Sequence, residues 1–382
     1  MKKNFTIKAV QAINALKTRK ICIECDHIPY TFENVPLKKI LNWLLVETTI
    51  ALKTKKAWGF PTHLQIEPST LCNLRCAFCP VTTGMNRQTG HMTLRTFQKV
   101  IDEIGQYLFL ILLWDWGEPF LNPAIYDMIA YARTRDIKIV SSTNAHIFAK
   151  GDHAEKLVRS GINSIICAVD GISQKTYETY RVRGNIETAI QGIQNIVAAK
   201  QKRCLKTPFV HLRFLPTKHN EHEIPKLKEF ARSLGVDALS LKTINPHDHE
   251  DFHSNSVDGK DFIPLNPKYQ RFNYDSEGFS IRNKNNSCKR LWNCPVIHWN
   301  GKVSPCTFDP NDSYTLGDLS KESFKKIWSG SSYRKYRSEF RKNYKKLTLC
   351  KNCSCSFEGG MLSTECVVDS HFFNSTFEFT KG

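Results

Sequence analysis

A short loop that carries three cysteines constrains this chain more than any other feature. Residues 71–80 read LCNLRCAFCP, so Cys72, Cys76 and Cys79 are separated by three and then two residues. Three thiols cannot all pair as disulfides, and a structural zinc site takes four ligands. Three thiolates suit a four-iron cluster that keeps one iron open to an outside ligand. Asn73 and Arg75 between the cysteines, and Pro80 directly after them, favour a loop wrapped around one object.

From residue 63 onward, short apolar runs alternate with amphipathic segments. The candidate strands are residues 63–67, 109–116, 137–142, 164–170, 209–215 and 238–243. The candidate helices are residues 94–104, 123–133, 154–160, 186–200 and 223–234. This order predicts right-handed βα units, a parallel sheet and the α/β fold class. In such folds the active site lies at the carboxyl ends of the strands.

At the cysteine loop the chain resembles the radical S-adenosylmethionine (SAM) superfamily, whose signature is C-x3-C-x-aromatic-C. Phe78 stands at the aromatic position. The resemblance implies a partial (β/α)6 barrel, here over residues 61–245, and a four-iron (4Fe-4S) cluster on the three cysteines. In the family, SAM chelates the open iron, and its reductive cleavage gives methionine and a 5′-deoxyadenosyl radical. Thiolates are soft ligands that suit such clusters.

Two motifs after the second and third predicted strands resemble SAM-binding turns of the family. Gly117 and Glu118 resemble the glycine–glutamate motif that receives the SAM amino group, with Trp116 in place of a first glycine. An ionised carboxylate only accepts hydrogen bonds and an ammonium only donates them, so this pairing is chemically apt. Ser142 and Asn144 lie in a turn similar to the family's Thr-Asn-Gly, and they are candidates to bind SAM or substrate.

A third motif follows the fourth predicted strand. Relatives carry a Ser-x-Asp-Gly turn at the SAM ribose and a later arginine at the SAM carboxylate, and Asp170 and Arg181 stand at the matching positions. A planar guanidinium binds a carboxylate bidentately, which agrees with this role. Three residues on neighbouring strands are open between substrate contact and a structural role: His211, Arg213 and Lys242.

A second group of cysteines follows a polar segment, residues 246–287, that we interpret as a linker. The group comprises Cys288, Cys294, Cys306, Cys350, Cys353, Cys355 and Cys366. Between them lie an apolar hairpin that turns at Asn300 and Gly301 and an amphipathic helix. Two cysteines near a hairpin plus a distant C-x2-C pair make a four-thiolate site, which suits iron–sulfur or zinc.

This region resembles the SPASM and twitch domains, which extend radical SAM enzymes at the C-terminus. We expect such a domain at residues 288–370, followed by a tail at residues 371–382. The resemblance implies one auxiliary 4Fe-4S cluster on Cys288, Cys306, Cys350 and Cys353. Cys294 is the alternative to Cys288. The full SPASM pattern has more cysteines after the closing C-x2-C pair than this chain offers, so we expect one auxiliary cluster and not two.

Residues 1–60 are predicted to be a helical extension with an extended segment near residues 21–30. This segment carries Cys22 and Cys25, a lone C-x2-C pair that we interpret as structural. Residues 40–52 form an apolar stretch flanked by lysines, which is compatible with contact to a membrane surface. Packing on the barrel is the favoured reading, and no stretch is long and apolar enough to span a bilayer.

The amino-acid composition indicates the compartment of the protein and the class of its partners. Fourteen cysteines without a signal-peptide pattern indicate a reducing compartment, so we expect a cytoplasmic protein. The net charge of +18 indicates either an acidic partner or a solvated basic surface. A basic run fits an acidic electron donor such as flavodoxin or ferredoxin: Lys325, Lys326, Arg334, Lys335, Arg337, Arg341, Lys342, Lys345 and Lys346. Nucleic acid is disfavoured, because aromatic residues do not interleave with basic ones on a strand face.

The predicted function is that of a radical SAM enzyme that abstracts hydrogen from an unidentified substrate. One auxiliary cluster would accept an electron in an oxidation or ligate the substrate. The N-terminal residues do not resemble a winged-helix peptide-binding domain, which favours a small-molecule over a peptide substrate. Two alternatives stay open. A peptide-modifying enzyme would share the same sites, whereas a non-catalytic iron–sulfur electron carrier would need neither Glu118 nor Arg181.

Overall fold

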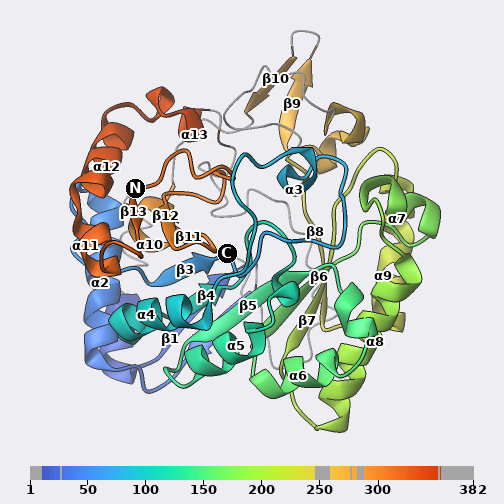
Figure 1. Ribbon diagram of the computed structural model, residues 1–382, viewed down its shortest axis with the longest axis horizontal. Helices are drawn as coiled ribbons and strands as arrows, with labels where there is room; N and C mark the ends of the chain where they lie inside the picture. The colour runs from blue at the N-terminus through green and yellow to red at the C-terminus, as the bar shows by residue number, and fades with distance from the viewer. Residues whose placement is uncertain are drawn as a thin grey trace.

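The computed structural model describes residues 11–25, 28–245, 259–275, 278–281, 288–351 and 353. Its centre is a nine-stranded sheet in the order β13-β12-β11-β3-β4-β5-β6-β7-β8 (Figure 1). Six neighbouring strands run parallel: β3 (His63–Ile66), β4 (Leu110–Leu112), β5 (Lys138–Thr143), β6 (Ser164–Ala168), β7 (Phe209–Phe214) and β8 (Ala238–Leu241). The six predicted strands and the α/β partial-barrel fold class are therefore confirmed.

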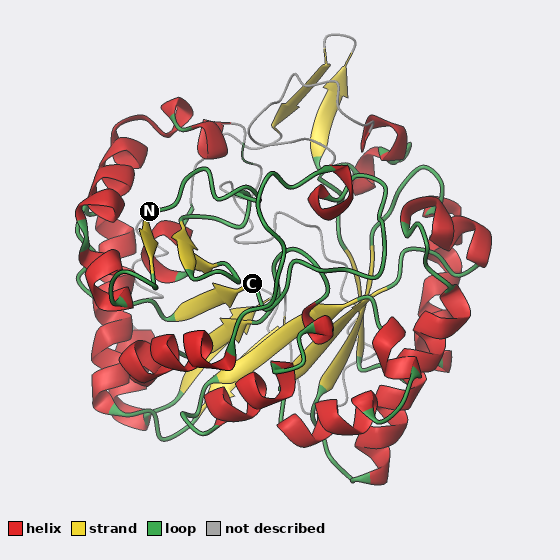
Figure 2. Cartoon of the chain, in the orientation of Figure 1, coloured by secondary structure: helices red, strands yellow, loops and turns green. Residues whose placement is uncertain are grey.

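Helices cover the outer face of these strands (Figure 2). They are α4 (Leu94–Ile104), α5 (Ile125–Arg133), α6 (His153–Ser160), α7 (Gln174–Tyr180), α8 (Ile186–Lys202) and α9 (Leu227–Ser233). Polar caps fix where several of them begin: the Thr93 side chain accepts a hydrogen bond from the Thr96 N–H at the start of α4. Outward strand residues such as Ile139 and Ile165 pack with the apolar helix faces in the main core. Inward strand residues such as Leu112 and Val140 pack in a second core, so the carboxyl ends of the strands are left for the site.

The N-terminal segment forms a β-hairpin where the sequence predicted only an extended stretch. β1 (Ile21–Cys25) pairs antiparallel with β2 (Ile28–Phe32). The Tyr30 hydroxyl donates a hydrogen bond to Ser164 Oγ at 2.8 Å, at the start of β6. The hairpin also packs with residues at the starts of β4, β7 and β8: Phe109, Phe209 and Ala238. It therefore covers the amino ends of the strands, opposite the end where parallel sheets carry their sites.

The two predicted N-terminal helices flank this hairpin. The first covers residues 11–18 of the described chain, and the second is α2 (Leu37–Leu52). α2 packs Val46 and Ile50 against Trp292 of the auxiliary region, by which we mean residues 288–353, as expected for a helix that packs on the protein. Several leucines on the outer face of α2 are about half exposed. In the described part of the chain, no helix is both long and apolar enough to cross a membrane.

The auxiliary region continues the main sheet. β11 (Val296–Ile297) pairs in parallel with β3, and β12 (Lys302–Ser304) and β13 (Gly317–Asp318) extend the sheet in antiparallel register. The predicted turn between β11 and β12 is present, and Gly301 adopts a φ of +83° that favours glycine. Because β11 hydrogen-bonds to the first barrel strand, the barrel and the auxiliary region share one framework.

Short helices complete the auxiliary region: α10 (Arg290–Asn293), α11 (Phe324–Ser329), α12 (Ser331–Asn343) and α13 (Thr348–Lys351). Tyr336 and Phe340 of α12 share an apolar cluster with α2, which ties the two ends of the chain together. Part of the segment predicted as a linker is a second hairpin, β9 (Phe272–Asp275) with β10 (Gly278–Ile281), which stands apart at the top of Figure 1. Three histidines of that segment lie outside the described residues: His247, His249 and His253.

Candidate active site

The loop after β3 holds the three clustered cysteines at the carboxyl end of the sheet. Its backbone is anchored to the chain just after α7, because the Arg75 N–H donates to the Val182 carbonyl (2.9 Å) and the Ala77 N–H donates to the Tyr180 carbonyl (3.0 Å). The Arg75 guanidinium also donates to the Cys72 carbonyl at 2.8 Å. These contacts hold the loop in one shape over its whole length.

The three thiols line one cavity of about 140 Å³. The other walls come from the ends of β4, β5 and β6 and include five further residues that the sequence singled out: Gly117, Glu118, Ser142, Asn144 and Arg181. The fold therefore brings the cysteine loop and the three predicted SAM-binding turns to one place. Phe78 and Asp170, the remaining two candidates, do not line this cavity.

Glu118 is a buried carboxylate with well-defined donors. It is 2% exposed, and it accepts hydrogen bonds from Thr143 Oγ1 and from the Asn144 N–H, both at 2.9 Å. Burial raises the pKa of Glu118 to about 7, although these donors and Arg181 act in the opposite direction. A ligand ammonium in the cavity would favour the charged carboxylate, which fits the amino group of SAM. Thr143 was not predicted as a site residue.

The backbone angle and the close neighbours at position 117 leave room only for glycine. Its φ is +84°, and an added Cβ would lie 2.5 Å from the carbonyl oxygen of Ser69. The next residue donates its N–H to the Leu71 carbonyl at 2.7 Å, so this turn and the cysteine loop pack backbone to backbone. Trp116, which replaces the usual first glycine, donates its indole N–H to the Thr307 carbonyl at 3.1 Å and thus reaches the auxiliary region.

Arg181 is held by a carboxylate behind it. Its Nε donates to Asp170 Oδ2 at 2.6 Å, and its Nη1 lies 3.6 Å from Cys76 Sγ. The other oxygen of Asp170 accepts the Leu215 N–H at 2.8 Å, and the Asp170 side chain is fully buried. The resemblance implies a ribose contact for Asp170, whereas its contacts in this structure orient Arg181. Arg181 itself lines the cavity, where a guanidinium can bind a carboxylate.

Phe78 supports the loop from outside the cavity. Its ring centroid lies 4.9 Å from that of Tyr180 and 5.3 Å from that of Phe262. On the other side of the loop, Asn144 Nδ2 donates to Asn73 Oδ1 at 2.8 Å and lies 3.9 Å from Cys72 Sγ. Aromatic packing and side-chain hydrogen bonds therefore hold the thiol loop from both sides.

The donor set fits an iron–sulfur cluster with SAM beside it. Burial raises the pKa of Cys72 to about 11 and of Cys79 to about 12, and it raises the pKa of Cys76 as well. A coordinating metal deprotonates such thiols. Soft thiolates, a carboxylate and a guanidinium on one cavity match the needs of a cluster and an amino acid ligand. Within the described ranges, no three His, Cys, Asp or Glu side chains are arranged as ligands of a single metal ion.

The auxiliary cysteines come from separate segments that meet beside α12. Cys350 Sγ lies 3.8 Å from the Tyr336 hydroxyl. Burial raises the pKa of Cys350, and the nearby thiols of Cys288 and Cys306 raise it further. The Cys353 N–H donates to the Cys350 carbonyl at 3.3 Å, which closes a tight turn. Three of the four predicted ligands are thus electrostatically coupled neighbours, and the fourth follows one turn later.

Cys294, the alternative ligand, is a thiol whose pKa is raised by its burial and also by the nearby Cys288. It nevertheless packs in another core than Cys288 and Cys350. It is fully buried in the core formed with the N-terminal hairpin. Burial, followed by the nearby Cys294 thiol, raises the pKa of Cys25 to about 12, so these two cysteines are neighbours. Cys22 is exposed while Cys25 is buried, in line with the structural reading of that pair. Cys355 and Cys366 lie outside the described residues.

Other sequence candidates lie away from the cavity. His211 is fully buried, with Nε2 2.6 Å from Ser240 Oγ, and neither it nor Arg213 nor Lys242 lines the cavity. Arg337 does not belong to the basic surface, contrary to the sequence interpretation. It is fully buried, with its guanidinium 4.2 Å from the Trp328 ring, because the helix turns this position toward an aromatic core. The other eight basic residues of the run are exposed.

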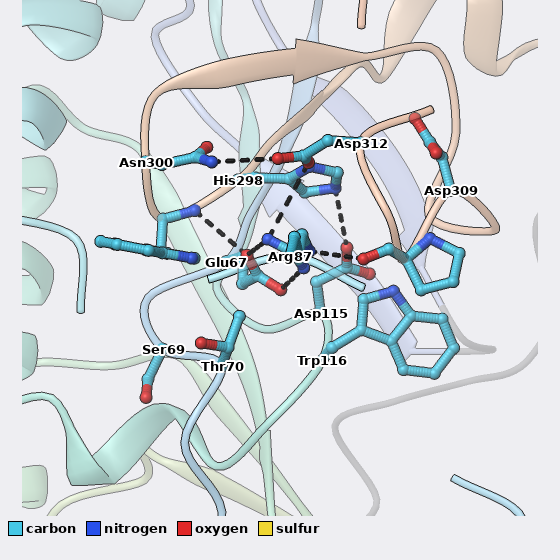
Figure 3. Close-up of polar contacts among 12 residues, drawn as sticks. Glu67, Ser69, Thr70, Arg87, Asp115, Trp116, His298, Asn300, Asp309 and Asp312 are labelled. Atoms are coloured by element: carbon cyan, nitrogen blue, oxygen red, sulfur yellow. Dashed lines mark hydrogen bonds and ion pairs between the residues drawn. The ribbon is translucent and has the colours of Figure 1, made fainter. Parts of the chain in front are cut away.

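Figure 3 shows a buried polar network that the sequence analysis did not single out. Arg87 donates two hydrogen bonds to Glu67, at 2.6 and 2.8 Å, and His298 is hydrogen-bonded to Asp312. Asp115, which lines the cavity, faces this network from the end of β4. One signal was available in the sequence: Asp115 is the single charged residue in the apolar run FLILLWDW.

Comparison with known protein families decides the assignment. The sequence model of the radical SAM superfamily matches residues 66–231, and that of the SPASM iron–sulfur cluster-binding domain matches residues 288–354. The chain belongs to the radical SAM superfamily. It is a radical SAM enzyme with a C-terminal SPASM domain. The cofactors of the enzyme are SAM, a 4Fe-4S cluster and auxiliary iron–sulfur clusters in the SPASM domain. The predicted family, enzyme class and cofactor types are confirmed.

Relatives of this radical SAM enzyme act on several kinds of substrate. The tungsten-containing aldehyde ferredoxin oxidoreductase cofactor-modifying protein of Pyrococcus furiosus is 23% identical over 76% of this chain and 87% of its own length. The AdoMet-dependent heme synthase of Nitratidesulfovibrio vulgaris is 22% identical over 74% of this chain and 83% of its own length. Streptococcus suis SuiB bound to precursor peptide SuiA has a TM-score of 0.58 at 16% identity, over 92% of this chain and 84% of SuiB, which shows a shared fold.

Proposed function

We propose that this radical SAM enzyme oxidises an organic substrate at the cavity beside Cys72, Cys76 and Cys79. The observation that carries the proposal is the convergence of three thiols, Glu118 and Arg181 on that one cavity. The thiolates would hold the first cluster, Glu118 would accept the amino group of SAM, and Arg181 would bind its carboxylate. When bound, the cluster and SAM supply an electron and a 5′-deoxyadenosyl radical, which removes a hydrogen atom from the substrate.

The chain's own residues prepare this cavity. Asp170 is fully buried and holds Arg181 at 2.6 Å, so the guanidinium is oriented before a ligand arrives. Thr143 and the Asn144 N–H both donate to Glu118, which limits the carboxylate to one orientation. We assign Ser142, which lines the cavity, to a contact with SAM or substrate. Phe78 contributes by packing behind the loop.

We assign one auxiliary 4Fe-4S cluster to Cys288, Cys306, Cys350 and Cys353. The thiols of Cys288 and Cys306 both raise the pKa of Cys350, which supports this set. Cys294 is not among the groups that act on Cys350, which disfavours the alternative. In an oxidation this cluster would accept the second electron. Zinc would satisfy the same four thiolates, and the iron content of the purified protein separates the two.

We propose a small acidic protein such as flavodoxin or ferredoxin as the external electron donor, in the reducing cytoplasm. The eight exposed basic residues of α11, α12 and residues 344–346 offer a positively charged surface for it. An encounter between opposite charges is screened by salt. Reduction by a flavodoxin system should therefore slow as ionic strength rises, and charge reversal at Lys342 and Lys346 should remove that dependence.

For the substrate we propose a small molecule, with a peptide as the second candidate. The relatives named above include a cofactor-modifying protein and a heme synthase, which favours the first. SuiB is bound to a precursor peptide, and the fold that this chain shares with it covers nearly its whole length, which favours the second. Both candidate substrates would react at the same thiols and the same cavity, so the two proposals differ only in which molecule enters the cavity.

The test is a substrate screen on the reduced enzyme with both clusters assembled. Panels of deuterated alcohols, amines and peptides are incubated with SAM, and deuterium in 5′-deoxyadenosine is measured by mass spectrometry. We expect transfer from at least one small-molecule panel, and none in a Cys76→Ala variant. Transfer from peptides alone would select the second candidate. Electron transfer through the protein without any cleavage of bound SAM would instead identify an electron carrier and contradict the proposal.

A further inference from the structure

Asp115 lines the cavity, and its almost fully buried carboxylate has one oxygen committed and the other without a hydrogen-bond donor among the described residues. Its Oδ1 accepts a hydrogen bond from Gln65 Nε2 at 2.8 Å and another from the Thr307 hydroxyl. Among the described residues its Oδ2 has no hydrogen-bond donor, although the side chain is only 1% exposed. The nearest charged partner of Oδ2 is His298 Nε2, at 3.7 Å. The carboxylate is thus fixed in place with one oxygen available.

His298 faces Asp115 and is held from behind. Its Nδ1 is hydrogen-bonded to Asp312, while Nε2 has no hydrogen-bond partner in the described part of the chain. Asp312 is also bonded by Asn300 Nδ2 at 2.9 Å and lies 3.2 Å from Lys302 Nζ, whose side chain is 41% exposed. Figure 3 shows Asp115, His298, Asp312 and Asn300 next to the Glu67–Arg87 pair. A line of titratable groups therefore runs from the cavity to the surface.

The charges around Asp115 and His298 favour a proton that these two side chains share. The pKa of Asp115 is raised to about 7, because burial and the charge of Glu67 raise it more than His298, the hydrogen bond from Thr307 and Arg290 lower it. Burial acts to lower the pKa of His298, but the hydrogen bond with Asp312 and the charges of Glu67 and Asp115 raise it above its usual range. The two groups can therefore exchange one proton near neutral pH. The neighbouring charge of Glu67 is balanced by Arg87.

The same carboxylate is connected to the auxiliary site. Gln65, which donates to Asp115, accepts a hydrogen bond from Arg290 in turn. Burial acts to lower the pKa of Arg290, whereas Cys294, Cys306, Asp115 and Cys288 raise it. Thr307, the second donor to Asp115, directly follows Cys306 in the chain. A change of charge at the auxiliary thiols is therefore felt at Asp115 through one guanidinium and two hydrogen bonds.

We propose that Asp115 is the proton acceptor of the cavity and that His298, held by its hydrogen bond with Asp312, takes the proton from Asp115, in step with the electron that the auxiliary cluster would take. This proposal rests on the oxidative function proposed above, and it names the substrate class: a carbon that bears both C–H and O–H or N–H, as in an alcohol or amine. The auxiliary cluster, which Cys288, Cys306, Cys350 and Cys353 would hold, would supply the acceptor for one electron once the hydrogen atom has left carbon. The O–H or N–H proton passes to Asp115 Oδ2, and a C=O or C=N bond forms.

The test is the pH dependence of the auxiliary cluster's midpoint potential in the enzyme with both clusters bound, followed by electron paramagnetic resonance between about pH 6 and pH 8. Reduction adds negative charge and so favours protonation of the Asp115–His298 pair. The potential of the wild type should therefore fall as pH rises, by up to about 59 mV for each tenfold change in proton concentration. Asp115→Asn and His298→Gln should flatten this slope.

Asp309→Asn is the matched control. Asp309 is a fully buried carboxyl of the segment after β12, held by Ser304 Oγ at 2.8 Å, and none of its hydrogen bonds goes to Asp115 or His298. The control should keep the wild-type slope. Equal slopes in the wild type, Asp115→Asn and His298→Gln would overturn the proposal, even if one of the variants were poorly folded.

A second readout separates this proposal from the proposed function. With an alcohol or amine that transfers deuterium, Asp115→Asn should still form labelled 5′-deoxyadenosine, while the oxidised product falls about 100-fold or more, as expected for loss of a general base. Unchanged product yield in this variant would contradict the role of Asp115. Failure of the wild type to cleave SAM would refute the proposed function, and the slope of the midpoint potential would still test the coupling itself.

Discussion

The two cysteine sites of this enzyme are built in different ways. The first takes all three thiols from one loop of eight residues, Cys72 to Cys79, whose backbone is pinned by hydrogen bonds to one neighbouring segment. The second collects thiols from residues 288 to 353, across α10, the β11–β12 hairpin and α13. A local site depends mainly on its own spacing, whereas a distributed site depends on the packing of every element that carries a ligand. The two sites should therefore respond differently to the same kind of damage.

The largest expected difference comes from removing one auxiliary ligand. Cys350→Ala should lower the iron content from about eight to about four atoms per chain, because one of two four-iron clusters is lost. The first loop makes no hydrogen bond to this cysteine, so reductive cleavage of SAM should continue while substrate oxidation stops. Iron analysis and 5′-deoxyadenosine assays after anaerobic reconstitution check both results. About twelve irons in the wild type would show a second auxiliary cluster and refute the single-cluster assignment.

The next largest effect is expected from the buried ion pair that lies between the barrel and the auxiliary region. Arg87 and Glu67 form an ion pair with side chains only 5% and 0% exposed, next to the auxiliary hairpin. Arg87→Met leaves a buried carboxylate without its partner, so the free energy of unfolding should fall by about 3–5 kcal/mol. Urea denaturation of the reconstituted protein measures this change, and the signal of the auxiliary cluster should be lost before that of the first cluster.

Arg135→Met is the matched control for this experiment. Arg135 and Asp102 also pair, at 2.7 Å, but with side chains 44% and 51% exposed. Such surface pairs contribute little to stability, so this variant should unfold at a urea concentration close to that of the wild type. Equal destabilisation by the two substitutions would show that the Glu67–Arg87 pair does not join the two regions.

The smallest of these effects is confined to the first site. Glu118→Gln removes the charge but keeps the shape, and SAM should bind about 10- to 100-fold more weakly, in line with 1.5–3 kcal/mol for a hydrogen bond to a charged group. Because the pKa of Glu118 is about 7, the carboxyl is protonated below neutral pH and cannot attract an ammonium. SAM affinity of the wild type should fall as pH drops from 8 to 6, by up to about tenfold.

Isothermal titration of the two proteins over this pH range measures the effect. The affinity of the Glu118→Gln variant for SAM should depend much less on pH. An unchanged pH dependence in the variant would assign the titration to another group of the cavity.

The sequence indicated which residues meet at the first cavity far better than it indicated what surrounds that cavity. The spacing of Cys72, Cys76 and Cys79 and the position of Glu118 after an apolar strand are readable from neighbouring residues. The pairing of β11 with β3 is not, because the two strands are short and far apart in the chain. For the same reason the Asp115–His298 contact was missed: each residue sits alone in an apolar run, and only the fold brings them together.

The basic run shows a second limit. Arg337 has the same charge as its neighbours, and composition alone placed it on the surface. The helix instead turns it between the Trp328 and Tyr333 rings, 4.2 and 4.6 Å from its guanidinium. Which face of an amphipathic helix is buried depends on aromatic partners, and here an arginine is part of that face.

The most direct test of the central claim is the formation of 5′-deoxyadenosine by the anaerobically reconstituted, reduced protein with SAM. The wild type should form it, and Cys76→Ala should form none above background, because the three thiols of the first loop act as one ligand set. Equal amounts from both proteins, or none from a wild type that carries a filled first cluster and bound SAM, would contradict the assignment of the first loop as the site of SAM cleavage.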